Sequence, residues 1–184
     1  MNNEMKQENP ATSNRAKVLF LAQAGVIAAL YVVLTIFINA LNLASGAIQI
    51  RISEALCILA LFTPAAIPGL AIGCLLANIL TGCIIWDVIF GTCATLIGAF
   101  FSYRLREHKI LATLPPVIAN MIIVPFVLYY GYGFTAAWMV GGVDLSIPFY
   151  VVTVGAGEVI SVCILGTLLR KALEPVSKYI FRVN

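Results

Sequence analysis

The segment AIQIRISEALCILALFTPAAIPGL, from Ala47 to Leu70, places two opposite charges in a chain that is otherwise mostly apolar. Arg51 and Glu54 are three residues apart, so on a helix they share a face and can pair with each other. Pro64 and Pro68 then interrupt the apolar run that follows. The segment therefore predicts a short apolar helix whose first turn is charged. Those charges either fasten the helix or border a polar opening.

The composition of the whole chain indicates a membrane protein. Of its 184 residues, 61% are hydrophobic and 10% are charged, whereas an ordinary globular domain is about one quarter charged. A water-soluble fold of this length could not cover so much apolar surface with so few polar side chains. The net charge of +3 is too small and too peripheral for nucleic-acid binding. We expect one domain in the lipid bilayer, 16–176, between a disordered tail, 1–15, and a C-terminal tail, 177–184.

Turn signals divide the apolar residues into six predicted membrane segments, which form an all-α bundle. They run approximately over 18–41, 53–62, 68–81, 86–103, 110–130 and 147–173. The second and third are shorter than the roughly 20 residues that a membrane helix needs. We therefore expect these two to line a protein cavity rather than to face lipid. Pro115, Pro116 and Pro125 are expected to kink the fifth segment.

The basic residues predict the orientation. All but one of the 11 Lys and Arg residues lie before the first segment, between the fourth and fifth, or after the sixth. Six crossings place these three groups on one side, which the positive-inside rule makes cytoplasmic. Both termini are then cytoplasmic, and Arg51, Glu54, Asp87 and Asp144 fall near the outer loops.

Several kinds of site are excluded by what the sequence lacks. The five cysteines show no C-x-x-C spacing and are expected to be small apolar packing residues. The chain contains no P-loop pattern, no H-E-x-x-H and no G-x-S-x-G, and its single histidine, His108, lies in a predicted cytoplasmic loop. We therefore expect no enzyme activity, no metal and no cofactor.

Three polar side chains are expected within the membrane. Glu158 is predicted near the bilayer midplane, where insertion scales give a carboxylate a cost of about 3 kcal/mol. No basic residue is expected at that depth, which favours ligand binding over a structural role. Asn120 and Asn78 suit either ligand binding or hydrogen bonds between helices. Asp87 suits either ligand binding or complementing its helix dipole.

The first segment carries small residues at helical spacing within LAQAGVIAALYVV. Ala24 and Ala28 are four residues apart, as are Gly25 and Ala29. Small residues at this spacing let two membrane helices approach closely. They predict either packing inside the bundle or a docking face for a partner membrane subunit.

The stretches RISEALCILALFTPAAIPGLAIGCLLANILTG, DVIFGTCATLIGA and AALYVVLT resemble the QueT family of substrate-binding S components of energy-coupling factor transporters. The resemblance implies an importer subunit in a bacterial plasma membrane that captures a queuosine precursor, either a 7-deazaguanine base or queuine. It also implies a transmembrane coupling subunit and two cytoplasmic ATPases as partners. Ala24 and Ala28 match the alanine motif by which such components meet the coupling subunit.

A 7-deazaguanine suits the predicted polar residues. Its guanine edge presents adjacent N–H donors, from which the Glu158 carboxylate can accept two hydrogen bonds. We expect Asn120 at the remaining edge, with Asn78 nearby, and Asp87 beside the amine of an aminomethyl precursor.

The flat ring and the mouth of the site call for further residues. Stacking on an aromatic side chain is a common way to hold a planar ligand. The candidates for stacking are Trp138, Tyr129 and Trp86, and the candidates for a gate or rim are Arg51 and Glu54.

Three other functions remain open from the sequence. A stand-alone proton-coupled carrier would use Glu158 as its proton site. An intramembrane enzyme would use Glu158 and Asp87 as acid and base, although no nucleophile or metal spacing accompanies them. A structural subunit would bind no ligand.

Overall fold

The computed structural model describes residues 10–41, 51–135, 139–140 and 143–181. Helices make up most of this part of the chain. In chain order the elements are α1 (Pro10–Ala40), η1 (Ile52–Leu61), α2 (Ala66–Leu80), α3 (Ile85–Arg104), η2 (Leu111–Thr113), α4 (Leu114–Phe126), η3 (Val127–Gly131), β1 (Met139–Val140), β2 (Val143–Asp144), α5 (Ser146–Glu158), η4 (Val159–Leu165), α6 (Gly166–Leu173) and α7 (Ser177–Ile180). The segments η1 and η2 are 3₁₀-helices, and η3 and η4 are π-helical.

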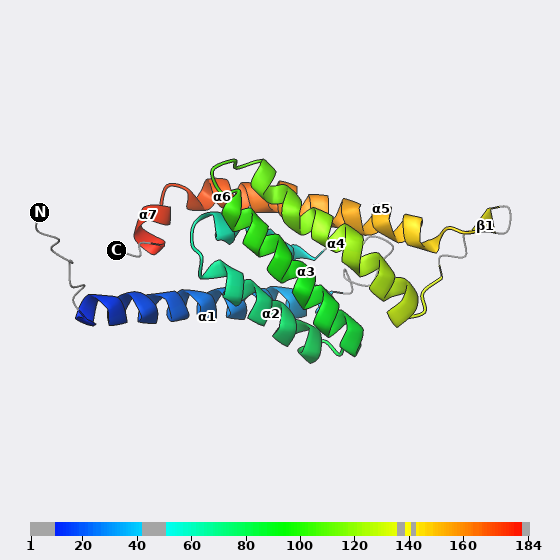
Figure 1. Ribbon diagram of the computed structural model, residues 1–184, viewed down its shortest axis with the longest axis horizontal. Coiled ribbons are helices and arrows are strands. Elements are labelled where there is room, and N and C mark those ends of the chain that lie inside the picture. Colours follow the sequence, from blue (N-terminus) through cyan, green and yellow to red (C-terminus); the bar gives the residue numbers. More distant parts are fainter. Residues whose placement is uncertain (1–9, 42–50, 136–138, 141–142, 182–184) are drawn as a thin grey trace, which may run out of the picture.

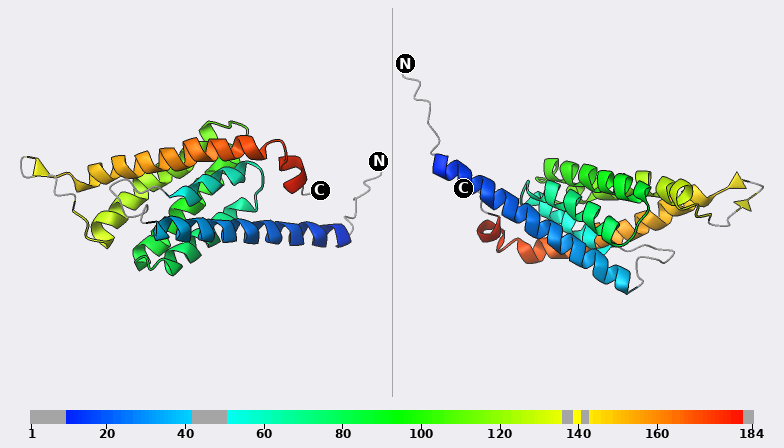
Figure 2. Two further views of the ribbon diagram at one scale, coloured as in Figure 1. Left: turned by 180° about the vertical axis from the view of Figure 1, so that it is seen from behind. Right: turned by 90° about the horizontal axis from the view of Figure 1, so that it is seen from below.

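Two long helical segments flank the bundle. One is α1, and the other is the continuous run of α5, η4 and α6; α2, α3 and α4 pack between and across them (Figure 1). Figure 2 shows η1 in the interior between the two long segments. The start of α1 lies at the same end of the bundle as α6 and α7, and the β1–β2 hairpin lies at the opposite end.

The second segment is short and buried, as predicted. Residues Ser53 to Ala60 of η1 are all buried, and the segment contacts α1, α3, α6 and η4. A 3₁₀-helix rises about 2.0 Å per residue, so ten residues reach farther than they would as an α-helix. In contrast, α2 exposes Leu75, Leu76 and Ile79 on one face. The expectation that neither short segment would have an exposed apolar face therefore fits η1 and not α2.

The small residues of α1 pack against glycines of α2. A Cβ atom built on Gly69 would lie 2.8 Å from the carbonyl oxygen of Ala24, and one on Gly73 would lie 3.0 Å from that of Ala28. Ala24 and Ala28 are buried, whereas Gly25 and Ala29 are exposed. The stripe is thus divided into an internal packing face and an outward face.

The prolines act differently from one another. Pro115 and Pro116 lie in the first turn of α4, where the missing N–H of proline costs no helical hydrogen bond. They start the helix and do not kink it, which corrects the prediction. Pro125 lies inside α4, directly before the helix continues as the π-helical η3.

Four helical runs are long and apolar enough to cross a membrane: Asn14–Ala40, Ile85–Arg104, Leu111–Gly131 and Ser146–Leu173. The prediction of a mostly helical protein with membrane-spanning helices is therefore confirmed, whereas the count of six spans is not. Helix α1 begins at Pro10, within the predicted disordered tail, and α7 lies within the predicted C-terminal tail.

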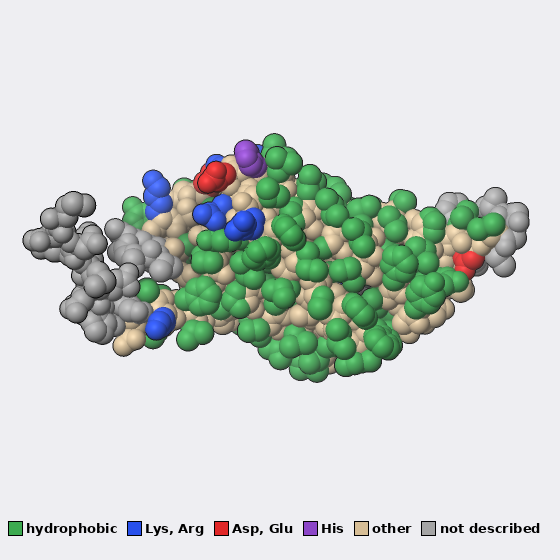
Figure 3. Space-filling model, viewed as in Figure 1, with side chains coloured by type: hydrophobic (Ala, Val, Ile, Leu, Met, Phe, Trp, Pro, Cys, Tyr) green, Lys and Arg blue, Asp and Glu red, His purple; other side chains and the backbone are tan. Residues whose placement is uncertain are grey.

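Basic side chains gather toward one end of the bundle, the left end in the view of Figure 3, while hydrophobic side chains cover the middle of that face. Apart from Arg51, the described basic residues come from the start of α1, the end of α3 with the α3–α4 connection, and the α6–α7 region. This is the arrangement that the positive-inside prediction requires.

Candidate functional site

A cavity of about 350 Å³ opens between the helix ends far from the basic end. Its walls come from the last turns of α1 and α2, the starts of η1 and α3, and the end of α4 with the residues after it. Thr35, Ile38, Asn39, Ile52, Thr81, Gly82, Cys83, Val124, Leu128 and Phe134 form part of the lining. Arg51, Ser53, Asn78, Asp87 and Tyr132 are the other lining residues.

A chain of polar contacts runs along this wall. The Arg51 guanidinium donates to Oδ1 of Asn78 at 2.9 Å, and the Asn78 amide donates to the backbone carbonyl of Asp87 at 3.2 Å. The Tyr132 hydroxyl donates to Oδ2 of Asp87 at 3.1 Å. Burial raises the pKa of Tyr132, and the Asp87 carboxylate raises it further, so this hydroxyl keeps its proton. The structure thus brings together Asn78 and Asp87, both predicted to bind ligand, and Arg51, predicted at a gate or rim.

Glu54 lies deeper than a rim residue. Its side chain is fully buried and accepts hydrogen bonds from Tyr31, Thr95 and Cys57. Among the residues that the structure describes, the two ion pairs both involve Glu174, so Arg51 and Glu54 do not pair as an i, i+3 couple. The prediction of Glu54 at a gate or rim is therefore wrong in its depth, whereas Arg51 does border the cavity.

An apolar layer floors the cavity. Val124 and Leu128 line it and pack against Val154 of α5 in one buried cluster. Asn120 lies four residues before Val124 in α4, and Glu158 lies four residues after Val154 in α5. In both helices this shift is toward the basic end of the bundle. That spacing is one helical turn, about 6 Å at 1.5 Å per residue. A polar layer therefore lies directly beneath the apolar floor.

Several polar atoms of this layer lack hydrogen-bond partners, and Asn120, although it lies next to Glu158, is not in hydrogen-bonding geometry with it. Glu158 is 3% exposed and Asn120 is 1% exposed. Oε2 of Glu158, both amide atoms of Asn120, and the hydroxyls of Ser53 and Ser161 are buried without a partner. Each such atom costs about 1–3 kcal/mol, and native structures rarely tolerate a group of them without a functional reason.

Glu158 also lies within electrostatic reach of other charges. Glu54 repels it and Arg51 attracts it, although Arg51 and Glu158, both within the described residues, form no ion pair. Glu158 is the last residue of α5, directly before the π-helical η4. Single π-helical turns inside α-helices are frequent at functional sites.

Two of the three aromatic residues predicted to stack on the ligand, Trp86 and Tyr129, do not line this cavity. Trp86 is 54% exposed and stacks on Phe90 with ring centroids 6.0 Å apart. It lines a separate apolar groove with Phe126 and Tyr130, and not this cavity. Tyr129 lies away from the cavity lining, and its hydroxyl donates to Asp144 at 2.9 Å. Trp138 lies outside the described residues.

The structure adds residues that the sequence did not single out for the site. Tyr132 and Phe134 line the cavity and stack on each other at 5.2 Å. Ser53 and Ser161 belong to the unpartnered group. Ser53 is adjacent to Glu54 and Ser161 is three residues from Glu158, so a search for hydroxyls beside membrane carboxylates would have found both. Within the described part of the chain, no group of three or more His, Cys, Asp or Glu residues could hold a metal ion.

The chain is similar in sequence to a known transporter. The chain is 36% identical over 98 residues to the queuosine precursor transporter QueT of Lactococcus lactis subsp. cremoris (strain MG1363). That alignment covers 50% of this chain and 57% of the relative, so the chain spans just over half the length of the curated relative that it matches. No solved structure matches the chain.

The family comparison covers more of the chain. The family model described as QueT transporter matches residues 21–175, a range that includes the cavity wall from Arg51 to Tyr132 and the polar layer with Glu158. The chain belongs to the QueT transporter family.

Proposed function

We propose that this chain is the substrate-binding subunit of an ATP-driven importer in a bacterial plasma membrane, and that its cargo is a queuosine precursor. The curated relative is named a queuosine precursor transporter. The observation that carries the proposal for this chain is the group of buried, unpartnered polar atoms beneath the cavity. A 7-deazaguanine base or queuine supplies donors and acceptors on one flat edge, which is what these atoms lack.

In this proposal the ligand enters the cavity from the outer side. The side chains of Val124, Leu128 and Val154 move apart and admit it to the polar layer beneath. The Glu158 carboxylate accepts two N–H bonds from the guanine edge, and Asn120 pairs with the adjacent edge. Ser53 and Ser161 offer hydroxyls to the remaining polar atoms. Tyr132 and Phe134, which line the cavity above the ring, close the entrance over it.

The cavity wall suits a substituent on the ring. The Asp87 carboxylate faces the cavity and can accept a hydrogen bond from the amine of an aminomethyl precursor. Asn78 and Arg51 stand beside it and keep that wall polar.

Delivery requires partners in this proposal. The chain has no P-loop pattern, so a transmembrane coupling subunit and two cytoplasmic ATPases supply the driving force. The positive-inside rule places the basic end of the bundle toward the cytoplasm. Both termini are therefore cytoplasmic in this proposal. The outward face of α1, with Gly25 and Ala29, is the candidate docking surface, since Ala24 and Ala28 are already in contact with α2.

The test is titration calorimetry of the purified protein against 7-deazaguanine, its aminomethyl derivative, queuine and guanine. We expect binding of at least one deazapurine, and Glu158→Gln should weaken it at least tenfold, about 1.4 kcal/mol, because the amide offers only one acceptor. Glu174→Gln is the matched control, since Glu174 is exposed at the basic end.

Two outcomes would contradict the proposal. Equal dissociation constants for wild type and Glu158→Gln would remove Glu158 from the site. Uptake that persists without the ATPases and stops when the proton gradient is dissipated would indicate a proton-coupled carrier instead.

A further inference from the structure

Glu54 is a buried carboxylate that the proposed ligand contacts do not use. It is fully buried, and unlike Glu158 it is well supplied with donors. The Tyr31 hydroxyl and the Thr95 hydroxyl, the latter at 3.3 Å, donate to Oε1, and Cys57 Sγ donates to Oε2 at 3.2 Å. The contrast between these two carboxylates calls for a different role for Glu54.

The donors come from separate elements. Tyr31 belongs to α1, Thr95 to α3, and Cys57 to η1 itself. Tyr31 and Thr95 are both fully buried, so water does not compete for these hydrogen bonds. The Glu54 side chain therefore joins the start of η1 to two other helices at one point.

The residues next to Glu54 are the ones that face the cavity. Arg51 and Ser53 line it, and the backbone N–H of Glu54 donates to the Arg51 carbonyl at 2.9 Å, which closes the first turn of η1. No side chain caps this helix start. A 3₁₀-helix has poorer hydrogen-bond geometry than an α-helix, so its first turn depends on contacts of this kind.

We propose that Glu54 is a positioning residue for ligand recognition. Held by Tyr31 and Thr95, it fixes the first turn of η1 so that the Ser53 hydroxyl and the Arg51 guanidinium face the cavity. The effect on ligand affinity rests on the proposed function. The hydrogen bonds by which Glu54 joins η1 to α1 and α3 do not depend on it.

The chain offers a matched set of variants. Tyr31→Phe and Thr95→Val each remove one hydroxyl from Glu54 and keep the shape of the side chain. Thr92→Val is the control, because Thr92 lies on the same helix as Thr95 and donates to its own helix at the Val88 carbonyl.

The first readout needs no ligand. Hydrogen–deuterium exchange of the peptide covering residues 52–56 should be about threefold to tenfold faster in Tyr31→Phe and Thr95→Val, the range expected for one lost hydrogen bond. Thr92→Val should leave it unchanged. Unaltered exchange in both test variants would overturn the proposal whether or not a deazapurine binds.

The second readout is the dissociation constant for the deazapurine that binds wild type best. Tyr31→Phe and Thr95→Val should each weaken binding about threefold to tenfold, and neither should weaken it further when Glu54→Gln is already present. A thermal midpoint that falls while the dissociation constant stays at the wild-type value would show that Glu54 only stabilises the fold. If wild type binds no deazapurine, the proposed function fails. The exchange measurement still tests whether Glu54 joins η1 to α1 and α3.

Discussion

Asn120 and Glu158 are held in a layer where polar atoms are buried without partners. Such an arrangement lowers the stability of the empty protein, because each atom has lost its hydrogen bonds to water without gaining new ones. It also prepares the site for a ligand that supplies the missing bonds. The same residues are thus expected to reduce stability and to provide affinity.

Replacing Asn120 with leucine separates these two effects. Leucine has the same number and branching of side-chain atoms as asparagine but no unpaired polar groups. We expect Asn120→Leu to raise the free energy of unfolding by about 1 kcal/mol and to weaken deazapurine binding at least tenfold. The measurements are thermal unfolding in detergent and titration calorimetry. A variant that is less stable than wild type would show that Asn120 already has a partner in the empty protein.

At the scale of elements, the close contact of α1 with α2 depends on glycine. A Cβ atom on Gly73 would lie 2.7 Å from the Tyr31 Cβ atom and 3.0 Å from the Ala28 carbonyl oxygen, so no side chain fits there without movement of a helix. A Cβ atom built on Gly25, on the outward face of α1, would have no other atom within 4 Å.

Gly73→Ala should therefore lower the free energy of unfolding by about 1–3 kcal/mol, the usual cost of overpacking. Gly25→Ala should leave stability unchanged or raise it slightly, since alanine favours helix over glycine. Comparing the thermal midpoints of the two variants checks this prediction. Equal midpoints would mean that α1 and α2 are not in contact at Gly73.

Much of the element order could be predicted from the sequence, because apolar runs and prolines carry local signals. The short second segment and the depth of Asn120 follow from spacing along one helix. The position of Glu54 could not be predicted, because its donors Tyr31 and Thr95 are distant in sequence. The sequence also gives no sign of which pocket Trp86 lines, because a tryptophan at a helix start can face either side of the helix.

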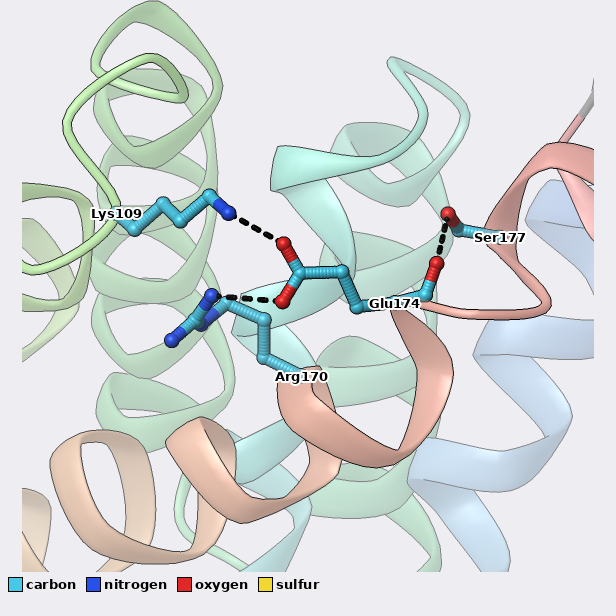
Figure 4. Close-up of polar contacts among 4 residues, drawn as sticks. All are labelled: Lys109, Arg170, Glu174 and Ser177. Carbon is cyan, nitrogen blue, oxygen red and sulfur yellow. Dashed lines mark hydrogen bonds and ion pairs between the residues drawn. The ribbon is translucent and has the colours of Figure 1, made fainter.

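At the scale of the whole molecule, one cluster joins the α3–α4 connection to the end of the last long helix. Glu174 accepts from Lys109 and, at 3.1 Å, from Arg170, while the Ser177 hydroxyl donates to the Glu174 carbonyl at 2.8 Å (Figure 4). Helix α7 then turns back onto the bundle, where Phe181 stacks on Phe62.

This cluster gives stability a dependence on acidic pH. The hydrogen bond from Lys109 lowers the pKa of Glu174, and the charges of Lys109 and Arg170 lower it further. A lowered pKa means that the contribution is present above the pKa of the unfolded chain and is lost as the pH falls through that of the folded protein. The effect is small, since Lys109 and Glu174 are exposed and their interaction is screened by solvent.

We expect the thermal midpoint of wild type to fall more between neutral and acidic pH than that of Glu174→Gln. Glu107→Gln is the control, because Glu107 is an exposed carboxylate of the α3–α4 connection with no ion pair among the described residues. Parallel pH profiles for wild type and Glu174→Gln would contradict this prediction.

The proposed assembly makes a separate prediction about the outer surface. Ala29→Trp adds bulk to the outward face of α1 and should prevent complex formation with the coupling subunit, while ligand binding is unchanged. Val152→Trp is the control, because Val152 is exposed on α5, the other flanking segment. Co-purification of the subunits measures the outcome. Assembly that survives Ala29→Trp would move the docking surface away from this face.

The most direct measurement is a structure of the protein bound to the deazapurine that it binds best. The heterocycle is expected in the layer beneath Val124, with its guanine-edge N–H groups about 3 Å from the Glu158 carboxylate oxygens and Asn120 beside it. A ligand bound elsewhere, with Oε2 of Glu158 still unpartnered, would contradict the account.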